Sequence, residues 1–156
     1  MMKVLFVCLG NICRSPTAEA VLRQKLEQQS IHSVEVDSAG TAGYHIGNPP
    51  DERAIAAGKA KGYALSSLSA RQLNVEDFNE FDLILAMDEA NLRDIHHIQP
   101  KGSLATVAMA SSFSEQSFIN VADPYYGDAQ GFYDVIQQCE SIALGIIEHY
   151  KQDASR

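Results

Sequence analysis

A cysteine, an arginine and a serine stand close together near the N-terminus, in the segment Cys8-Leu-Gly-Asn-Ile-Cys-Arg-Ser15. The planar guanidinium of Arg14 can bind two oxygens of a phosphoryl group at once, a task for which lysine is a poor substitute. A bent loop that enters a helix aims backbone N–H groups at such an anion, and the helix start adds partial positive charge. The spacing therefore predicts a cradle for a tetrahedral oxyanion, with a cysteine facing it.

The same surroundings favour the thiolate form of Cys8, because a helix N-terminus and a nearby cation stabilise negative charge. A thiolate that faces a bound phosphate is a nucleophile that faces phosphorus. Gly10 and Asn11 tolerate a positive φ, as a nest of N–H groups requires, and the Ser15 hydroxyl could donate a hydrogen bond to the sulfur. The predicted phosphate-binding residues are Leu9, Gly10, Asn11, Ile12, Cys13 and Arg14.

Asp123 is the best candidate for a proton donor. A phenol leaves a phosphate ester more readily when an acid protonates its oxygen. Pro124 restricts Asp123 to extended conformations and so sets the direction of its carboxyl group. Alone, Asp-Pro would be interpreted as a turn, but the cysteine loop favours the acid. The predicted substrate rim consists of four aromatic residues, Tyr44, His45, Tyr125 and Tyr126.

These residues need elements that position them, and apolar runs alternate with amphipathic stretches along the chain. Strands are predicted over 3–8, 34–39, 82–86 and 105–109, and helices after Ser15 as N-cap and over 51–61, 88–95 and 132–150. Such alternation is typical of an α/β fold. We expect a single domain over residues 1–156, with a doubly wound sheet of about four parallel strands and helices on both faces. Ligands bind such sheets at the carboxyl ends of the strands.

Composition excludes several classes of function. The chain has 12 Lys+Arg against 20 Asp+Glu and a net charge of −8, without clustered basic residues, so neither nucleic acid nor an anionic membrane is an expected partner. No segment approaches the roughly 20 apolar residues of a membrane span. Three cysteines are too few for a secreted disulfide framework, so we expect a cytoplasmic protein. Charge alone would not suggest an anionic substrate.

The chain resembles the low-molecular-weight protein tyrosine phosphatases over nearly its whole length. The resemblance is carried by Val7 to Glu19 and by the segments Asp37-Ser-Ala-Gly-Thr41, Pro50-Asp-Glu-Arg53, Ala70-Arg-Gln72, Met87-Asp88 and Asp123-Pro-Tyr-Tyr-Gly127. It implies hydrolysis of phosphotyrosine proteins or aryl phosphates, with inorganic phosphate as product and inhibitor and with neither metal nor cofactor.

The resemblance also implies a role for each site residue. Cys8 would be the nucleophile, Arg14 the phosphate clamp, Ser15 the thiolate stabiliser and Asp123 the general acid and then the general base. The remaining roles are loop bracing by Asn11 and Ser38, redox protection by Cys13, and a grip on the substrate ring by Tyr44 and Tyr125. One position departs from the pattern, because Leu68 stands where many members have a bracing histidine.

Three alternatives are less favoured. A zinc site built on Cys8 and Cys13 would lack an obvious second pair of ligands. An arsenate reductase on the same scaffold would need a redox cysteine pair after the third strand, and no cysteine lies between residues 14 and 138. A phosphopeptide-binding module would need neither a nucleophile nor an acid. Outside the loop, Asp88 is interpreted as an N-cap and Cys139 as a core residue.

Overall fold

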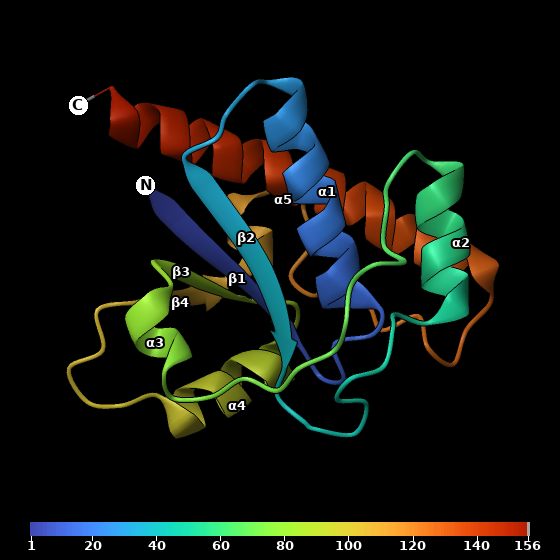
Figure 1. Cartoon of the computed structure of the whole chain (residues 1–156), viewed down its shortest axis with the longest axis horizontal. Helices are drawn as coiled ribbons and strands as arrows, with labels where there is room; N and C mark the ends of the chain where they lie inside the picture. The colour runs from blue at the N-terminus through green and yellow to red at the C-terminus, as the bar shows by residue number, and fades with distance from the viewer. Residues whose placement is uncertain (156) are drawn as a thin grey trace.

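The computed structural model describes residues 1–155 and has the predicted α/β architecture (Figure 1). Every predicted strand and helix is present, with bounds that differ by a few residues. In chain order the elements are β1 (Met2–Cys8), α1 (Arg14–Gln28), β2 (Val34–Gly40), α2 (Glu52–Ala60), α3 (Asp77–Glu80), β3 (Leu83–Ala86), α4 (Glu89–Ile98), β4 (Thr106–Met109), the 3-10 helix η1 (Ala110–Phe113) and α5 (Ala129–Ala154).

The strands form one parallel sheet in the order β2-β1-β3-β4. From β1 the chain goes to β2 on one side and then to β3 and β4 on the other, so the strand order reverses beside β1. Loops diverge at such a point and leave a crevice at the carboxyl end of the strand. The loop that begins at Cys8 leaves β1 at this crevice, and the prediction of a doubly wound sheet is confirmed.

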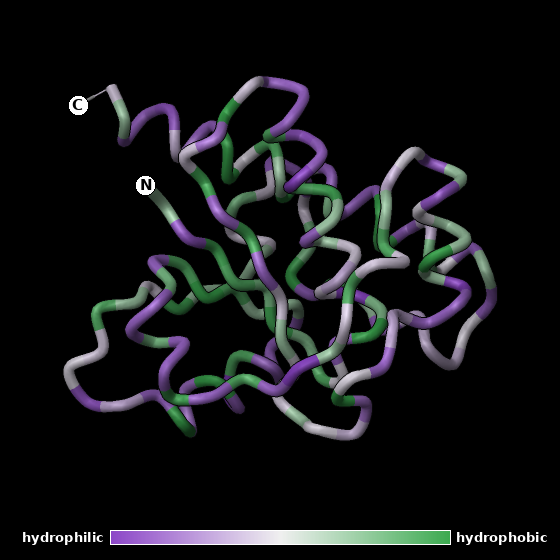
Figure 2. The backbone as a smooth tube through the Cα atoms, viewed as in Figure 1, coloured by the Kyte–Doolittle hydropathy of each residue, from purple (hydrophilic) through white to green (hydrophobic). Residues whose placement is uncertain are grey.

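Helices cover both faces of the sheet, which explains why β1 is apolar without interruption. Val4 and Phe6 point to the face covered by α1 and α5, whereas Leu5 and Val7 point to the face that carries α3 and α4. All four side chains are at most 1% exposed. Apolar colour accordingly runs along most of β1 in Figure 2.

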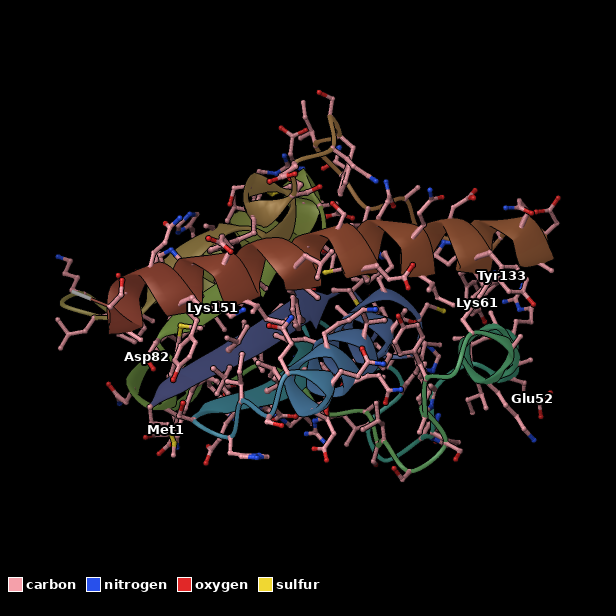
Figure 3. The ribbon with its side chains drawn as sticks, turned by 90° about the horizontal axis from the view of Figure 1, so that it is seen from above. Met1, Glu52, Lys61, Asp82, Tyr133 and Lys151 are labelled. Atoms are coloured by element: carbon pink, nitrogen blue, oxygen red, sulfur yellow. The ribbon has the colours of Figure 1, made fainter. Side chains whose placement is uncertain are left out.

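Helix α5 lies along α1 and the sheet for most of its length (Figure 3). Its buried residues recur every three or four positions from Phe132 to Ile147, which confirms the predicted apolar stripe, and Cys139 is a core residue with 1% exposure. Gly145 allows a close approach, because a Cβ atom there would lie 1.6 Å from the carbonyl oxygen of Phe113.

None of the helices found within residues 1–155 is long and apolar enough to cross a bilayer.

Candidate active site

A pocket of about 300 Å³ opens at the carboxyl end of β1. Most of the residues predicted for the site line it together, although they come from distant parts of the chain. The lining residues are Cys8, Leu9, Gly10, Ile12, Cys13, Arg14, Tyr44, His45, Asp123, Tyr125 and Tyr126. Asn11, Ser15 and Ser38 lie behind this lining and are at most 5% exposed.

The prediction that Ser15 is the N-cap of the first helix is wrong. Helix α1 begins at Arg14, with Cys13 in the N-cap position and no side-chain cap. The Ser15 hydroxyl lies instead 3.0 Å from the Cys8 sulfur, because the first turn of the helix directs it back at the end of β1. The first N–H groups of the helix therefore receive no hydrogen bond from a capping side chain and stay available to an anion.

Asn11 holds the turn of the loop. Its φ of 58° is left-handed, whereas Gly10 has no positive φ. The Asn11 side-chain amide donates to the hydroxyl oxygens of Ser15, at 2.8 Å, and of Ser38, at 2.9 Å, while its carbonyl oxygen accepts from the Arg71 backbone N–H at 3.0 Å. Because the Ser15 oxygen accepts from Asn11, its own hydrogen can point to the Cys8 sulfur.

The bracing network extends to two residues whose roles the sequence did not predict, Glu19 and Arg71. Ser38 donates to the buried carboxylate of Glu19 at 2.6 Å, and burial raises the pKa of that carboxyl group. Arg71 supplies the backbone N–H to Asn11, and its side chain pairs with Asp37 and Asp77. The segment Ala70-Arg-Gln72, which carries part of the family resemblance, is the sequence feature that could have indicated the role of Arg71.

Leu68 departs from the family pattern without leaving Asn11 unbraced. An apolar side chain cannot donate a hydrogen bond, but Arg71, three residues further on, donates through its backbone. The same segment is anchored to the end of β2, because Gly40 donates to the Arg71 carbonyl at 2.9 Å and accepts from the Leu73 N–H at 2.7 Å. Backbone contacts therefore position the Asn11 side of the phosphate loop, which is the segment Cys8 to Ser15.

Arg14 is buried, with 3% of its side chain exposed, and an acidic partner holds it. Its Nη1 donates to Asp88 Oδ2 at 2.6 Å and to the Val121 carbonyl at 3.0 Å. Asp88 also caps α4 in a capping box with Asn91. The interpretation of Asp88 as an N-cap is therefore correct but incomplete, since the same carboxylate orients the arginine of the pocket.

Asp123 lies across the pocket from the loop and is 40% exposed. Its Oδ1 accepts from the Tyr125 N–H at 3.1 Å, and its Oδ2 lies 3.7 Å from Arg14 Nη2. Tyr125 and Tyr126 meet edge to face with ring centroids 4.9 Å apart, and Tyr44 is exposed on the pocket wall. The carboxylate thus stands between an aromatic mouth and the arginine.

The three cysteines of the chain are free thiols in different environments. Cys8 and Cys13 both line the pocket, whereas Cys139 does not. Burial and the nearby Asp51 carboxylate raise the pKa of Cys13 to about 12, so its sulfur is a neutral thiol at neutral pH.

A parallel α/β sheet with a thiol, a buried arginine and a carboxylate in one pocket at a helix start defines the class of cysteine-dependent phosphatases. Comparisons with known proteins agree. Residues 3–156 match the family model described as low molecular weight phosphotyrosine protein phosphatase. A human protein of that name is 47% identical over an alignment of 148 residues, and the match covers 93% of each chain.

Solved structures give the same result. A protein tyrosine phosphatase from Entamoeba histolytica, with Hepes in its active site, superimposes with a TM-score of 0.94 at 36% identity and covers 99% of both chains. A Drosophila arginine phosphatase has a TM-score of 0.90 at 31% identity and covers 96% of this chain and 98% of its own. The chain belongs to the low molecular weight phosphotyrosine protein phosphatase family, and it is an enzyme that hydrolyses phosphate monoesters.

Proposed function

We propose that this enzyme hydrolyses phosphotyrosine and small aryl phosphates in two displacements, with Cys8 as nucleophile and Asp123 as acid and base. The observation that carries the proposal is that the Cys8 sulfur, the Arg14 guanidinium and the Asp123 carboxylate line one pocket, with the Ser15 hydroxyl 3.0 Å behind the sulfur. We further propose that residues 1–156 act as one phosphatase domain.

In the first displacement the Cys8 thiolate attacks phosphorus and forms the S–P bond while the bond to the phenol oxygen breaks. Protonated Asp123 gives its proton to that oxygen, so the phenol leaves neutral. The loop N–H groups and Arg14 bind the equatorial oxygens through a loose transition state. Held by Asp88 and Val121, the guanidinium is already oriented before substrate binds.

In the second displacement water attacks the cysteinyl-phosphate and the Asp123 carboxylate takes its proton. The S–P bond breaks, Cys8 leaves as the thiolate, and inorganic phosphate is released. Ser15 donates to sulfur in both steps, which eases the departure most because negative charge then returns to the sulfur. The phosphate product can occupy the same loop and is therefore a competitive inhibitor.

The walls of the pocket favour an aryl group. Leu9 and Ile12 supply apolar surface, and the exposed rings of Tyr44, Tyr125 and Tyr126 can stack on a phenyl ring. The substrates are therefore proteins that carry phosphotyrosine, together with small aryl phosphates.

The free thiols support a cytoplasmic location, because a reducing compartment keeps a nucleophilic cysteine active. Cys13 shares the pocket with Cys8, which supports its role as a redox partner. Oxidation of Cys8 to the sulfenic acid by a peroxide would allow Cys13 to condense with it, forming a disulfide and releasing water.

Cys8→Ser is the direct test. We expect it to abolish hydrolysis of phosphotyrosine peptides and 4-nitrophenyl phosphate while inorganic phosphate still binds, whereas Cys139→Ala keeps the activity as a control for loss of a buried thiol. Asp123→Asn should slow phenyl phosphate far more than 4-nitrophenyl phosphate, whose phenol leaves without help. Turnover in Cys8→Ser, or equal losses in Asp123→Asn, would contradict the respective role. Phosphoserine and phosphoarginine peptides serve as comparison substrates.

A further inference from the structure

We propose that Arg53, in the first turn of α2, is a positioning residue that holds the acid segment 123–126 against the phosphate loop. This inference rests on the acid role proposed for Asp123. Arg53 donates from Nη2 to the Tyr125 carbonyl oxygen at 2.9 Å. The N–H of the same residue, Tyr125, donates to Asp123 Oδ1 at 3.1 Å. Arg53 therefore holds Tyr125, the residue whose N–H orients the acid, without touching substrate itself.

The Arg53 guanidinium also packs on two aromatic rings, one from the acid segment and one from α5. Its Cζ lies 5.4 Å from the centroid of the Tyr125 ring and 4.7 Å from that of Phe132. Phe132 is 3% exposed and belongs to the core side of α5. Helix α2 lies beside the N-terminal end of α5, near the labelled Glu52 and Tyr133 (Figure 3). Arg53 thus lies between the Tyr125 ring of the acid segment and the Phe132 ring of the buried core.

Arg53 and Asp51 together form a bridge between the acid segment and the phosphate loop, and Asp51 makes the contact with the loop. Arg53 donates from Nε to Asp51 Oδ1 and from Nη2 to Oδ2, each at 3.0 Å, and it holds the pKa of Asp51 below its usual range. The Asp51 backbone N–H donates to the Ile12 carbonyl oxygen at 2.8 Å. Asp51 and Arg53 therefore link the backbone of the phosphate loop to that of the acid segment.

The bridge needs the shape of an arginine. Its planar fork makes the two-point contact with Asp51 and still donates to the Tyr125 carbonyl, and its face covers both rings. A lysine has one ammonium group and cannot satisfy this geometry. Without the bridge, the Asp123 side chain, which is 40% exposed, would lose its fixed direction. An acid must lie within hydrogen-bond reach of the leaving oxygen, so the loss falls on proton transfer and spares the attack by sulfur.

The experiment measures kcat/KM of Arg53→Ala and Arg53→Lys for phenyl phosphate and for 4-nitrophenyl phosphate. General acids contribute about 100- to 10,000-fold, so misdirection of the acid should cost phenyl phosphate about 10-fold and 4-nitrophenyl phosphate little. Arg53→Lys should lose activity in the same direction, because it keeps the charge without the fork. Arg93→Ala, an exposed arginine of α4 with no ion pair in the described part of the chain, is the control and should behave as wild type.

A double variant separates positioning from a general structural role. If Arg53 acts through Asp123, Arg53→Ala should cause no further loss for phenyl phosphate once Asp123→Asn is present. Equal losses for both substrates, or a full further loss in the double variant, would overturn the inference. If Asp123→Asn alone still slows phenyl phosphate more than 4-nitrophenyl phosphate, the acid role of Asp123 stands even when the inference about Arg53 fails. The two failures are therefore distinguishable.

Discussion

Ser15→Ala removes the hydroxyl that lies 3.0 Å from the Cys8 sulfur. The same hydroxyl accepts from the Asn11 side chain, which keeps its hydrogen bonds to Ser38 and Arg71 in the variant. Ser15 is fully buried, so water cannot replace that hydroxyl without rearrangement of the loop. A hydrogen bond to a charged group contributes about 1.5–3 kcal/mol. Since each 1.36 kcal/mol is tenfold in rate, turnover should fall by roughly 10- to 100-fold. Both displacements should become slower, because the Cys8 thiolate attacks phosphorus in the first and leaves it in the second.

The assay is stopped-flow hydrolysis of 4-nitrophenyl phosphate, which separates the release of nitrophenol from the steady state. We expect a slower steady state together with an initial burst of nitrophenol, since breakdown of the cysteinyl-phosphate loses its stabilised leaving group. Thr17→Val is the matched control, because it removes another buried hydroxyl of α1, one that donates to the Cys13 carbonyl rather than to sulfur. If Ser15→Ala turns over like wild type, or if Thr17→Val loses as much, the assignment of Ser15 to the thiolate is wrong.

Three further predictions concern the surroundings of the pocket. Asp88→Asn keeps the cap of α4 but removes the charge that faces Arg14, so urea unfolding should show a free energy of unfolding lower by about 1.5–3 kcal/mol. Asp88→Ala also removes the cap and should lose about 1 kcal/mol more. Equal stability of the wild type and both variants would refute the role of Asp88 as both cap and partner of Arg14. Iodoacetamide at pH 8 should alkylate Cys8 and spare Cys13, whose pKa of about 12 keeps it protonated. In a separate sample that has not been alkylated, mild peroxide should give a Cys8–Cys13 disulfide by thiol mapping; Cys8 sulfinic acid without that disulfide would contradict the redox role. Burial raises the pKa of Glu19, so its contribution to stability is present below the pKa of the unfolded chain, near 4.5, and falls as pH rises through the pKa of the folded protein. Glu19→Gln should remove this pH dependence. Parallel curves of unfolding free energy against pH for the two proteins would count against it.

The sequence alone determined the fold class, and it predicted most of the residues that line the candidate active site. A buried strand, a cysteine, a loop with Asn11, an arginine and a helix are consecutive in the chain, so local spacing already predicts their arrangement around an anion. The alternation of strands and helices predicted the parallel sheet, because parallel strands need crossover helices. The apolar stripe predicted the buried face of α5, because periodicity reports which side of an element is buried. Asp123 was predicted as the acid for a similar reason, since Pro124 restricts its backbone locally.

Tertiary structure decided how these groups are held. The Arg14–Asp88 contact spans 74 residues of sequence, and the hydrogen bond from Arg71 to Asn11 spans 60. No local pattern reports such pairs, because they depend on the strand order that places the ends of β1, β2 and β3 together. Ser15 shows the limit best: its type and position fit a helix cap equally well, and only the direction of the first turn of α1 sends its hydroxyl to the sulfur.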